Sequence, residues 1–329
     1  MPEENKKVYL TRLIPDAGVE MLKQAFPAFE MNDSDRVLSK DELKSRVAGR
    51  DGLVTLLTDK IDGEVMDAAG PQLKVVANFA VGYDNIDLNA ATERGILVTN
   101  TPGVLTDATA DFAWALLMAT ARRISESERF TRALKFDAWG PKLMLGGDFV
   151  GRTLGVIGAG RIGSVFASRS VGWNMKILYA DEFRNEELEE KFGAQKVDVD
   201  TLLRESDFVS IHVPLLPSTH HLINAESLRK MKPTAYLVNT SRGPVVNEAE
   251  LAQALREKVI AGAGLDVYEF EPEVHPELLE LENVVLAPHI ASATLETRDK
   301  MAMMAAENAI EVLSGRRPPN LVNTDVLNS

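Results

Sequence analysis

The sequence predicts an α/β protein with two doubly wound domains, each built around a parallel sheet. Short apolar runs rich in β-branched residues alternate with helical stretches, which is the pattern of parallel strands joined by crossover helices. The 329 residues exceed the roughly 250–300 residues that one hydrophobic core usually serves. A second series of strands begins at Thr153, so two domains are expected.

The first series of strands belongs to a domain that ends near residues 100–103. Its strands are expected at residues 8–10, 52–58, 73–79 and 96–99, and two of its helices at residues 62–69 and 88–94. A long amphipathic helix follows over residues 104–123, because apolar side chains recur there at helical spacing.

Residues 125–151 read as an irregular segment with many large apolar side chains, among them Phe136, Trp139 and Leu143. Apolar groups of this size need a surface to cover them. Two interpretations remain open, because the segment could pack on another subunit or fold over its own domain.

The second series of strands forms the other domain. These strands are expected at residues 153–158, 176–180, 207–213, 235–240, 263–267 and 284–288. A last amphipathic helix over residues 295–313 follows the final strand, and it is expected to return to the first domain.

Composition excludes several classes of function. The net charge of −13 argues against nucleic acid or an anionic membrane as the main partner, since both require clustered Lys and Arg. The absence of cysteine excludes disulfides, thiolate nucleophiles and zinc–thiolate sites, and no metal site is expected. The charged N-terminus, residues 1–7, predicts no secretory signal, and no run is long and apolar enough for a membrane helix. A cytoplasmic protein is therefore expected.

A glycine-rich turn predicts dinucleotide binding. The strand at residues 153–157 leads directly into Gly158-Ala159-Gly160-Arg161-Ile162-Gly163, and a helical stretch follows. In this Rossmann-type arrangement Gly158 permits the tight turn, Gly160 admits the pyrophosphate and Gly163 lets the helix pack on the strand. The free N–H groups of the helix N-terminus then favour the anion.

Asp181 ends the next strand, about 20 residues further on, where a ribose-binding carboxylate is expected. A carboxylate there accepts hydrogen bonds from the ribose hydroxyls and repels a 2′-phosphate, which favours NAD over NADP. The alternative is that Asp181 only caps the following helix. Arg184 lies close enough in sequence to keep NADP possible.

Three polar side chains follow successive strands of the second domain. Arg242, Glu271 and His289 lie just beyond the strands at residues 235–240, 263–267 and 284–288, at the edge where open α/β sheets bind ligands. An Arg can hold a carboxylate in a bidentate fork, a His can donate a proton as hydride arrives, and a Glu can favour the charged imidazole. Together they suit the reduction of an anionic carbonyl compound.

Each of the three also has a structural interpretation: Arg242 could pair with surface acids, Glu271 could be solvated, and His289 could cap the sheet. The other four histidines are expected to differ from His289. His212 ends a strand and could border a cofactor pocket, whereas the surface positions are expected to be His220, His221 and His275.

The chain resembles the D-isomer-specific 2-hydroxyacid dehydrogenases along almost its whole length. The motifs that carry the resemblance are residues 81–87 (VGYDNID), 158–163 (GAGRIG), 212–214 (HVP), 239–243 (NTSRG), 264–267 (GLDV) and 288–294 (PHIASAT). The resemblance implies a flavodoxin-like substrate-binding domain, residues 1–101 and 291–329, and a Rossmann NAD(P)-binding domain, residues 102–290.

The resemblance also implies roles for individual residues. Arg242 becomes the substrate clamp, His289 the acid/base, and Glu271 its partner. The substrate carboxylate is expected at the backbone amides of Val81 and Gly82, with Ser292 nearby. The cofactor is expected to contact, besides the glycine turn and Asp181, His212, Pro214, Thr240, Ser241, Asp266 and Ala291.

Within this family the chain is most similar to the glyoxylate/hydroxypyruvate reductases. The features are the PHIASAT motif and the Trp139-containing segment before the glycine turn. By that resemblance residues 123–150 are a dimerisation arm of a homodimer, and Trp139 reaches the partner's active site. The expected reaction reduces glyoxylate or hydroxypyruvate to the D-2-hydroxy acid with NAD(P)H.

Other functions on the same fold stay open. An NAD(H)-sensing corepressor could keep every motif, and it would bind NADH without reducing 2-oxo acids. A phosphoglycerate dehydrogenase is also possible, although the chain ends at Ser329 without room for a regulatory domain. A 2-ketogluconate-type reductase is harder to separate by sequence.

Overall fold

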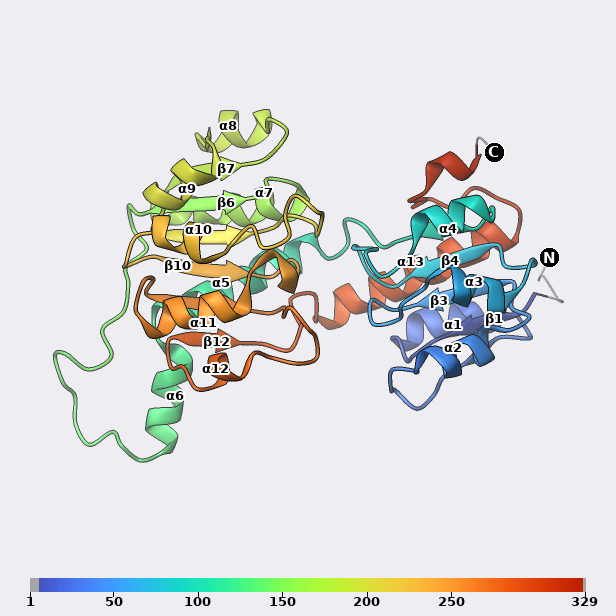
Figure 1. The fold of residues 1–329 in the computed structure, drawn as a ribbon, viewed down its shortest axis with the longest axis horizontal. Coiled ribbons are helices and arrows are strands. Elements are labelled where there is room, and N and C mark those ends of the chain that lie inside the picture. Colours follow the sequence, from blue (N-terminus) through green and yellow to red (C-terminus); the bar gives the residue numbers. More distant parts are fainter. Residues whose placement is uncertain (1–5, 328–329) are drawn as a thin grey trace. The chain divides into compact units, whose positions relative to one another are not determined.

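The structure is a computed structural model that describes residues 6–327. Most of residues 1–7, from which the absence of a secretory signal was predicted, therefore lie outside the described part. Figure 1 shows two compact α/β units. The first comprises the described parts of residues 1–105 and 293–329, and the second is Thr106–Ser292. Each unit has an all-parallel sheet with flanking helices, so the predicted fold class is confirmed.

The first unit has a five-stranded sheet in the order β2-β1-β3-β4-β5. Its strands are β1 (Val8–Leu10), β2 (Glu30–Met31), β3 (Gly52–Thr55), β4 (Val75–Asn78) and β5 (Leu97–Thr99). Its helices are α1 (Asp16–Ala25), α2 (Lys40–Val47), α3 (Gly63–Ala69), α4 (Leu88–Glu93) and α13 (Leu295–Leu313), followed by the short η3 (Thr324–Leu327). Every residue of β1, β3 and β4 is buried, which explains their continuous apolar runs.

Helix α13 follows the second unit in the chain and packs on α1, β3 and β4 of the first unit. The two helices approach closely at Gly18, where a Cβ atom would come within 2.8 Å of the Ala302 side chain. The alanine-rich face of α13, including Ala302, Ala305 and Ala309, is buried in this contact layer. Its N-terminus is capped by Thr294, whose hydroxyl accepts from Thr297 N at 3.1 Å.

The second unit has a seven-stranded sheet in the order β12-β11-β10-β9-β6-β7-β8. Its strands are β6 (Thr153–Ile157), β7 (Lys176–Ala180), β8 (Gln195–Lys196), β9 (Phe208–Ile211), β10 (Tyr236–Asn239), β11 (Gly262–Leu265) and β12 (Val284–Leu286). Strand order reverses between β6 and β9, and the carboxyl ends of strands at such a reversal are where open α/β sheets bind ligands.

Helices cover both faces of this sheet (Figure 1). Its longer helices are α5 (Thr106–Ala121), α6 (Ile124–Arg132), α7 (Arg161–Ser168), α8 (Glu186–Phe192), α9 (Val199–Glu205), α10 (Ala225–Lys230) and α11 (Glu248–Arg256). The short ones are η1 (Arg169–Trp173), η2 (Gly243–Val245) and α12 (Pro276–Leu279). On the α5–α7 face Trp114 stacks on Phe166 at 4.7 Å, and its Nε1 donates to Phe166 O at 2.8 Å.

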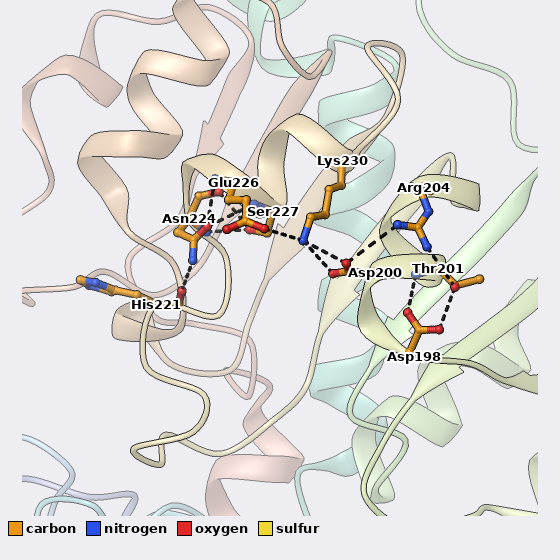
Figure 2. Close-up of polar contacts among 9 residues, drawn as sticks. All are labelled: Asp198, Asp200, Thr201, Arg204, His221, Asn224, Glu226, Ser227 and Lys230. Atoms are coloured by element: carbon orange, nitrogen blue, oxygen red, sulfur yellow. Dashed lines mark hydrogen bonds and ion pairs between the residues drawn. The ribbon is translucent and has the colours of Figure 1, made fainter.

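The opposite face is covered by α9, α10 and α11, which bury Leu202, Leu228 and Leu251. Figure 2 shows the polar contacts at the outer side of this layer: Lys230 on α10 pairs with Asp200 on α9 at 3.0 Å and with Glu226 at 2.9 Å. Helix α10 is capped by Asn224, which accepts from Ser227 N at 3.1 Å. These contacts join α9 and α10 on one face of the sheet.

Some sequence expectations were wrong in detail. The segment expected to be irregular begins with helix α6, which buries no residue and is stabilised by pairs such as Arg123–Glu126 at 2.6 Å. Ile124 and Phe130 are the only apolar residues in α6, so few apolar positions mark this helix in the sequence. The two-residue strands β2 and β8 were not predicted, and β3 stops at Thr55 because Asp59 then turns the chain by accepting from Leu56 N at 2.8 Å.

Candidate active site

The glycine turn between β6 and α7 is built as a cradle. Gly158 has a φ of 92°, and a Cβ there would come within 2.8 Å of the His212 backbone. A Cβ on Gly163 would overlap Gly158 O, so the helix packs on the strand only through glycine. At Gly160, by contrast, a Cβ would meet nothing within 4 Å, and α7 begins there without a side-chain cap. The free N–H groups of α7 therefore face open space suited to a pyrophosphate.

Asp181, which follows β7, touches this cradle. One carboxylate oxygen accepts from Ala159 N at 2.7 Å and the other from Phe183 N at 3.0 Å. The cap of α8 is Asn185, which accepts from Leu188 N at 2.9 Å, so the alternative that Asp181 caps the following helix is wrong. Asp181 lies beside the glycine turn, where a carboxylate that binds the ribose hydroxyls would be needed.

Arg184 is paired with Glu189, to which its Nε and Nη2 donate at 2.8 and 2.7 Å. These hydrogen bonds, together with one from the Tyr179 hydroxyl, lower the pKa of Glu189. A guanidinium held by a carboxylate in this way is not directed at a 2′-phosphate.

His212 follows β9 and lies beside the same turn. Its Nε2 is 2.9 Å from Ser210 Oγ, and burial lowers the pKa of His212 to about 3. The imidazole is therefore neutral at physiological pH. The neighbouring Pro214 is exposed.

The loop after β10 is shaped by Asn239, the last residue of the strand. Its Oδ1 accepts from Ser241 N at 3.0 Å and from Ser241 Oγ at 2.8 Å, while its Nδ2 donates to Arg242 O at 2.9 Å. Arg242 Nη1 in turn donates to Ser241 O at 2.8 Å. The Thr240 hydroxyl is buried and has no partner among residues 6–327, which leaves it available to a bound group.

Gly243 brings two of these loops together. A Cβ at Gly243 would overlap the backbone of Tyr268, so any other residue would push the loop after β10 away from the loop after β11. The first loop carries Arg242, and the second carries Glu271.

Glu271 and His289 form a hydrogen-bonded pair. Glu271 Oε2 lies 2.9 Å from His289 Nδ1, and Glu271 Oε1 accepts from Tyr268 N at 3.0 Å. Burial raises the pKa of Glu271, but the bond to His289, the Tyr268 N–H and the charge of Arg242 outweigh it, so the net pKa is lowered. Because Nδ1 is engaged by a carboxylate, Nε2 is the ring nitrogen that can exchange a proton with a substrate.

The backbone around His289 is held in an unusual conformation. His289 has a φ of 56°, in the left-handed region that non-glycine residues rarely adopt. The fully buried Asp266 stabilises the following turn, because its carboxylate accepts from Ile290 N at 2.8 Å and from Ala291 N at 2.7 Å. Burial raises the pKa of Asp266, and these two N–H donors partly oppose the rise.

The other expected site residues lie in different surroundings. Val81 and Gly82 belong to the first unit, on the loop after β4, and both are half-buried. Trp139 lies in the irregular part of the 123–150 segment with 82% of its surface exposed. Ala291 is buried and Ser292 half-buried, both directly beyond the turn that follows His289.

A second carboxylate–histidine cluster was missed by sequence reasoning. His221, expected at the surface, is half-buried, and its Nε2 lies 2.6 Å from Glu269 Oε1. The buried Glu248 accepts from Glu269 N and from His275 N, at 3.1 Å for the latter. His275 was also expected to be exposed, but its Nδ1 is buried and unpartnered within the described chain. No spacing in the sequence joins these residues, since they come from the loop before α10, the start of α11 and the segment after β11.

No helix of the part described is long and apolar enough to cross a membrane, and residues 6–327 contain no cluster of ligands that could hold a metal ion.

Comparison with known proteins identifies related chains along the full length. The family model for the D-isomer specific 2-hydroxyacid dehydrogenase, NAD binding domain, matches residues 114–291. The chain is 54% identical to a glyoxylate reductase of Korarchaeum cryptofilum over 324 residues, 98% of this chain and 97% of that one. It is 52% identical to a glyoxylate reductase of Thermococcus litoralis, with 98% of each chain covered.

Solved structures of glyoxylate reductases are also similar to this chain. An NADPH-dependent glyoxylate/hydroxypyruvate reductase of Sinorhizobium meliloti, in complex with NADP and malonate, is 33% identical with a TM-score of 0.85, and 97% of each chain is covered. A glyoxylate reductase of Paecilomyes thermophila is 32% identical with a TM-score of 0.85, covering 97% of this chain and 98% of that one.

Proposed function

The chain belongs to the family of D-isomer-specific 2-hydroxyacid dehydrogenases, and from that premise we propose that it reduces glyoxylate or hydroxypyruvate with NAD(P)H. The product would be the D-2-hydroxy acid. The observation that carries the proposal is the Glu271–His289 pair, placed with Arg242 at the carboxyl edge of the sheet that also forms the glycine cradle. Sequence identity of 54% and 52% to two glyoxylate reductases, over 98% of this chain, supports the choice of substrate.

The residues present fit a nicotinamide dinucleotide. The open space above Gly160 and the uncapped start of α7 would accept the pyrophosphate, and Asp181 would accept the ribose hydroxyls. The buried, unpartnered Thr240 hydroxyl, together with Ser241, Asp266 and Ala291, would line the nicotinamide side, and His212 and Pro214 the adenine side. When bound, the reduced nicotinamide supplies a hydride to the carbonyl carbon of the substrate.

The catalytic roles follow from the chemistry of each side chain. Arg242 would hold the substrate carboxylate and polarise the carbonyl, with the Val81 and Gly82 amides and Ser292 as further contacts. As the carbonyl carbon gains hydride, His289 would release its Nε2 proton to the carbonyl oxygen and become neutral. Glu271 stabilises the protonated imidazole before that transfer through its contact with Nδ1.

NAD is the preferred cofactor in this proposal. Asp181 would repel a 2′-phosphate, and Arg184 is directed to Glu189 rather than left to bind one. NADP remains the alternative because the Sinorhizobium meliloti relative is an NADPH-dependent enzyme.

The segment 123–150 would be a dimerisation arm. It exposes 90% of Leu134, 82% of Trp139 and 66% of Leu145, a set of apolar side chains that a second copy of the chain would cover. In such a homodimer, which we place in the cytoplasm, Trp139 would contribute to the partner's substrate pocket. Sedimentation of the wild-type chain and of a Leu134→Ser, Trp139→Ser variant would test the arm, since an unchanged mass would contradict it.

Turnover is the direct test of the function. NADH and NADPH oxidation should be measured with glyoxylate, hydroxypyruvate, 2-ketogluconate and 3-phosphohydroxypyruvate, for the wild type and for His289→Ala. We expect glyoxylate or hydroxypyruvate to be the best substrate and His289→Ala to lose turnover while it still binds NADH. Tight NADH binding without reduction of any of these acids would instead favour a sensor of the corepressor type.

A further inference from the structure

The loop after β4 carries the two amides to which the proposed function assigns the substrate carboxylate. Phe79 and Ala80 are buried, and the chain then emerges at Val81 and Gly82. Within residues 6–327 neither the N–H of Val81 nor that of Gly82 donates to a protein acceptor. Both donors are therefore available, and what matters is how they are oriented.

Three consecutive carbonyl groups of the same loop, those of Ala80, Val81 and Gly82, are engaged. Thr101 N donates to Ala80 O at 2.9 Å. Asn100 Nδ2 donates to Val81 O at 2.8 Å, and Asn78 Nδ2 donates to Gly82 O at 2.9 Å. Three consecutive carbonyl oxygens are thus held by three donors from the ends of β4 and β5.

Holding a carbonyl oxygen also orients the next N–H. The peptide group is planar and trans, so its N–H points opposite to its C=O. The contact to Ala80 O therefore directs the N–H of Val81, and the contact from Asn100 to Val81 O directs the N–H of Gly82. Rotation of either peptide would break a hydrogen bond on the protein side.

We infer that Asn100 is a positioning residue for the substrate carboxylate, an inference that rests on the proposed function. It does not touch the substrate. By holding Val81 O it orients the Gly82 N–H alongside the Val81 N–H, which the contact to Ala80 O directs, while Asn78 anchors the next peptide at Gly82 O. Preorganised donors of this kind bind an anion without a cost for reorienting the backbone.

The asparagines are themselves fixed by buried partners. Asn308 on α13 is fully buried and donates to Asn100 O at 3.0 Å, and Asn100 N donates to Asn320 O at 3.3 Å. Asn78 is also fully buried, and its Oδ1 accepts from Thr55 Oγ1 at 3.2 Å. The loop orientation is therefore tied to β3, β5 and α13 within one unit.

A purely structural role would look different, and the chain offers a matched control. Asn323 is a buried asparagine in the same unit, and its Nδ2 donates to Ile96 O at 2.9 Å, just before β5 begins. Asn100 follows β5 at the opposite end. Both side chains engage a backbone carbonyl, but only Asn100 engages the loop of Val81 and Gly82.

The experiment compares Asn100→Ala with Asn323→Ala in steady-state kinetics with glyoxylate and NADH, with oxalate as an unreactive competitor. We expect Asn100→Ala to raise KM and the oxalate inhibition constant in parallel by about tenfold or more, because charge-assisted hydrogen bonds lose their alignment. KM for NADH should stay unchanged. Asn323→Ala should reduce the unfolding temperature but keep KM for glyoxylate. Equal changes in both variants, or none in Asn100→Ala, would overturn the inference.

A second readout does not depend on turnover. In wild-type protein labelled with ¹⁵N-valine and ¹⁵N-glycine and saturated with NADH, oxalate should shift the Val81 and Gly82 amide resonances. If the wild type reduces no 2-oxo acid but these resonances shift, and Asn100→Ala lacks the shift that Asn323→Ala keeps, the proposed function fails and the inference stands. If they do not respond to oxalate, the inference fails whatever the turnover.

Discussion

Replacing Glu271 by glutamine tests the central pair most directly. Glutamine keeps the size and the hydrogen-bonding ability of the side chain but removes the negative charge 2.9 Å from His289 Nδ1. Reduction requires the protonated imidazole, so activity should fall as pH rises and that proton is lost. Without the carboxylate the protonated form is less favoured, and the fall should occur at lower pH.

The expected size follows from the geometry. A hydrogen bond to a charged partner is stronger than a neutral one by about 1–1.5 kcal/mol, and about 1.4 kcal/mol corresponds to one pH unit. The side chains of His289 and Glu271 are 27% and 30% exposed, so solvent keeps the effect at the lower end of that range. We expect the alkaline fall of kcat/KM in Glu271→Gln to lie about 0.7 pH unit below that of the wild type.

The assay is kcat/KM for glyoxylate reduction between about pH 5 and pH 9, with NADH affinity measured by fluorescence as the control. NADH affinity should be unchanged, because Glu271 is not part of the glycine cradle. If the two pH profiles coincide, Glu271 does not stabilise the protonated His289, and its role in the mechanism is refuted.

Three further predictions follow from other sites. First, burial depresses the pKa of His212 to about 3 in the folded state, whereas its pKa in the unfolded state is 6.5. Between these values the unfolded state binds a proton that the folded state does not, so the free energy of unfolding falls as pH falls below 6.5. Urea unfolding between about pH 6.5 and pH 4 should therefore show a smaller loss of stability for His212→Asn than for the wild type. Second, Gly163→Ala should lower the free energy of unfolding by about 1–3 kcal/mol, because the added Cβ overlaps Gly158 O. Gly160→Ala should keep the free energy of unfolding and weaken NADH binding, since a Cβ there meets no protein atom. Equal effects of the two variants would contradict the assignment of the cradle. Third, Asp181→Ser should raise the ratio of NADPH to NADH kcat/KM, and an unchanged ratio would remove Asp181 from cofactor choice.

Much of the fold could be predicted from the sequence because its signals are local. The β6–α7 turn is specified by three glycines, of which two tolerate no other side chain, and helix α13 was expected over the residues it occupies, 295–313. Helix α6 could not be predicted in the same way, since it buries nothing and its stabilising pairs are ordinary surface charges. Strand ends were misplaced where a side chain such as Asp59 turns the chain earlier than its apolar run suggests.

The candidate site shows the same limit. Arg242, Glu271 and His289 could be selected because each follows a strand of one parallel sheet, and such positions converge at one edge. The residues that hold them could not, because their contacts join distant parts of the chain. Glu248 engages the backbone of Glu269 and His275, on either side of Glu271, and nothing in its own sequence neighbourhood indicates this.

The proposed substrate groups are oriented by contacts inside their own unit. In the first unit, Asn78 and Asn100 hold the carbonyls of the Val81–Gly82 loop. In the second, Asn239 shapes the turn of Arg242, and Asp266 stabilises the turn after His289 despite its positive φ. Each set of donors is thus formed before any ligand binds, and the strain at His289 is compensated by a fully buried carboxylate. A variant that disturbs one set should therefore leave the other intact: Asn100→Ala should keep the pH profile of the wild type, and Glu271→Gln should keep its affinity for oxalate.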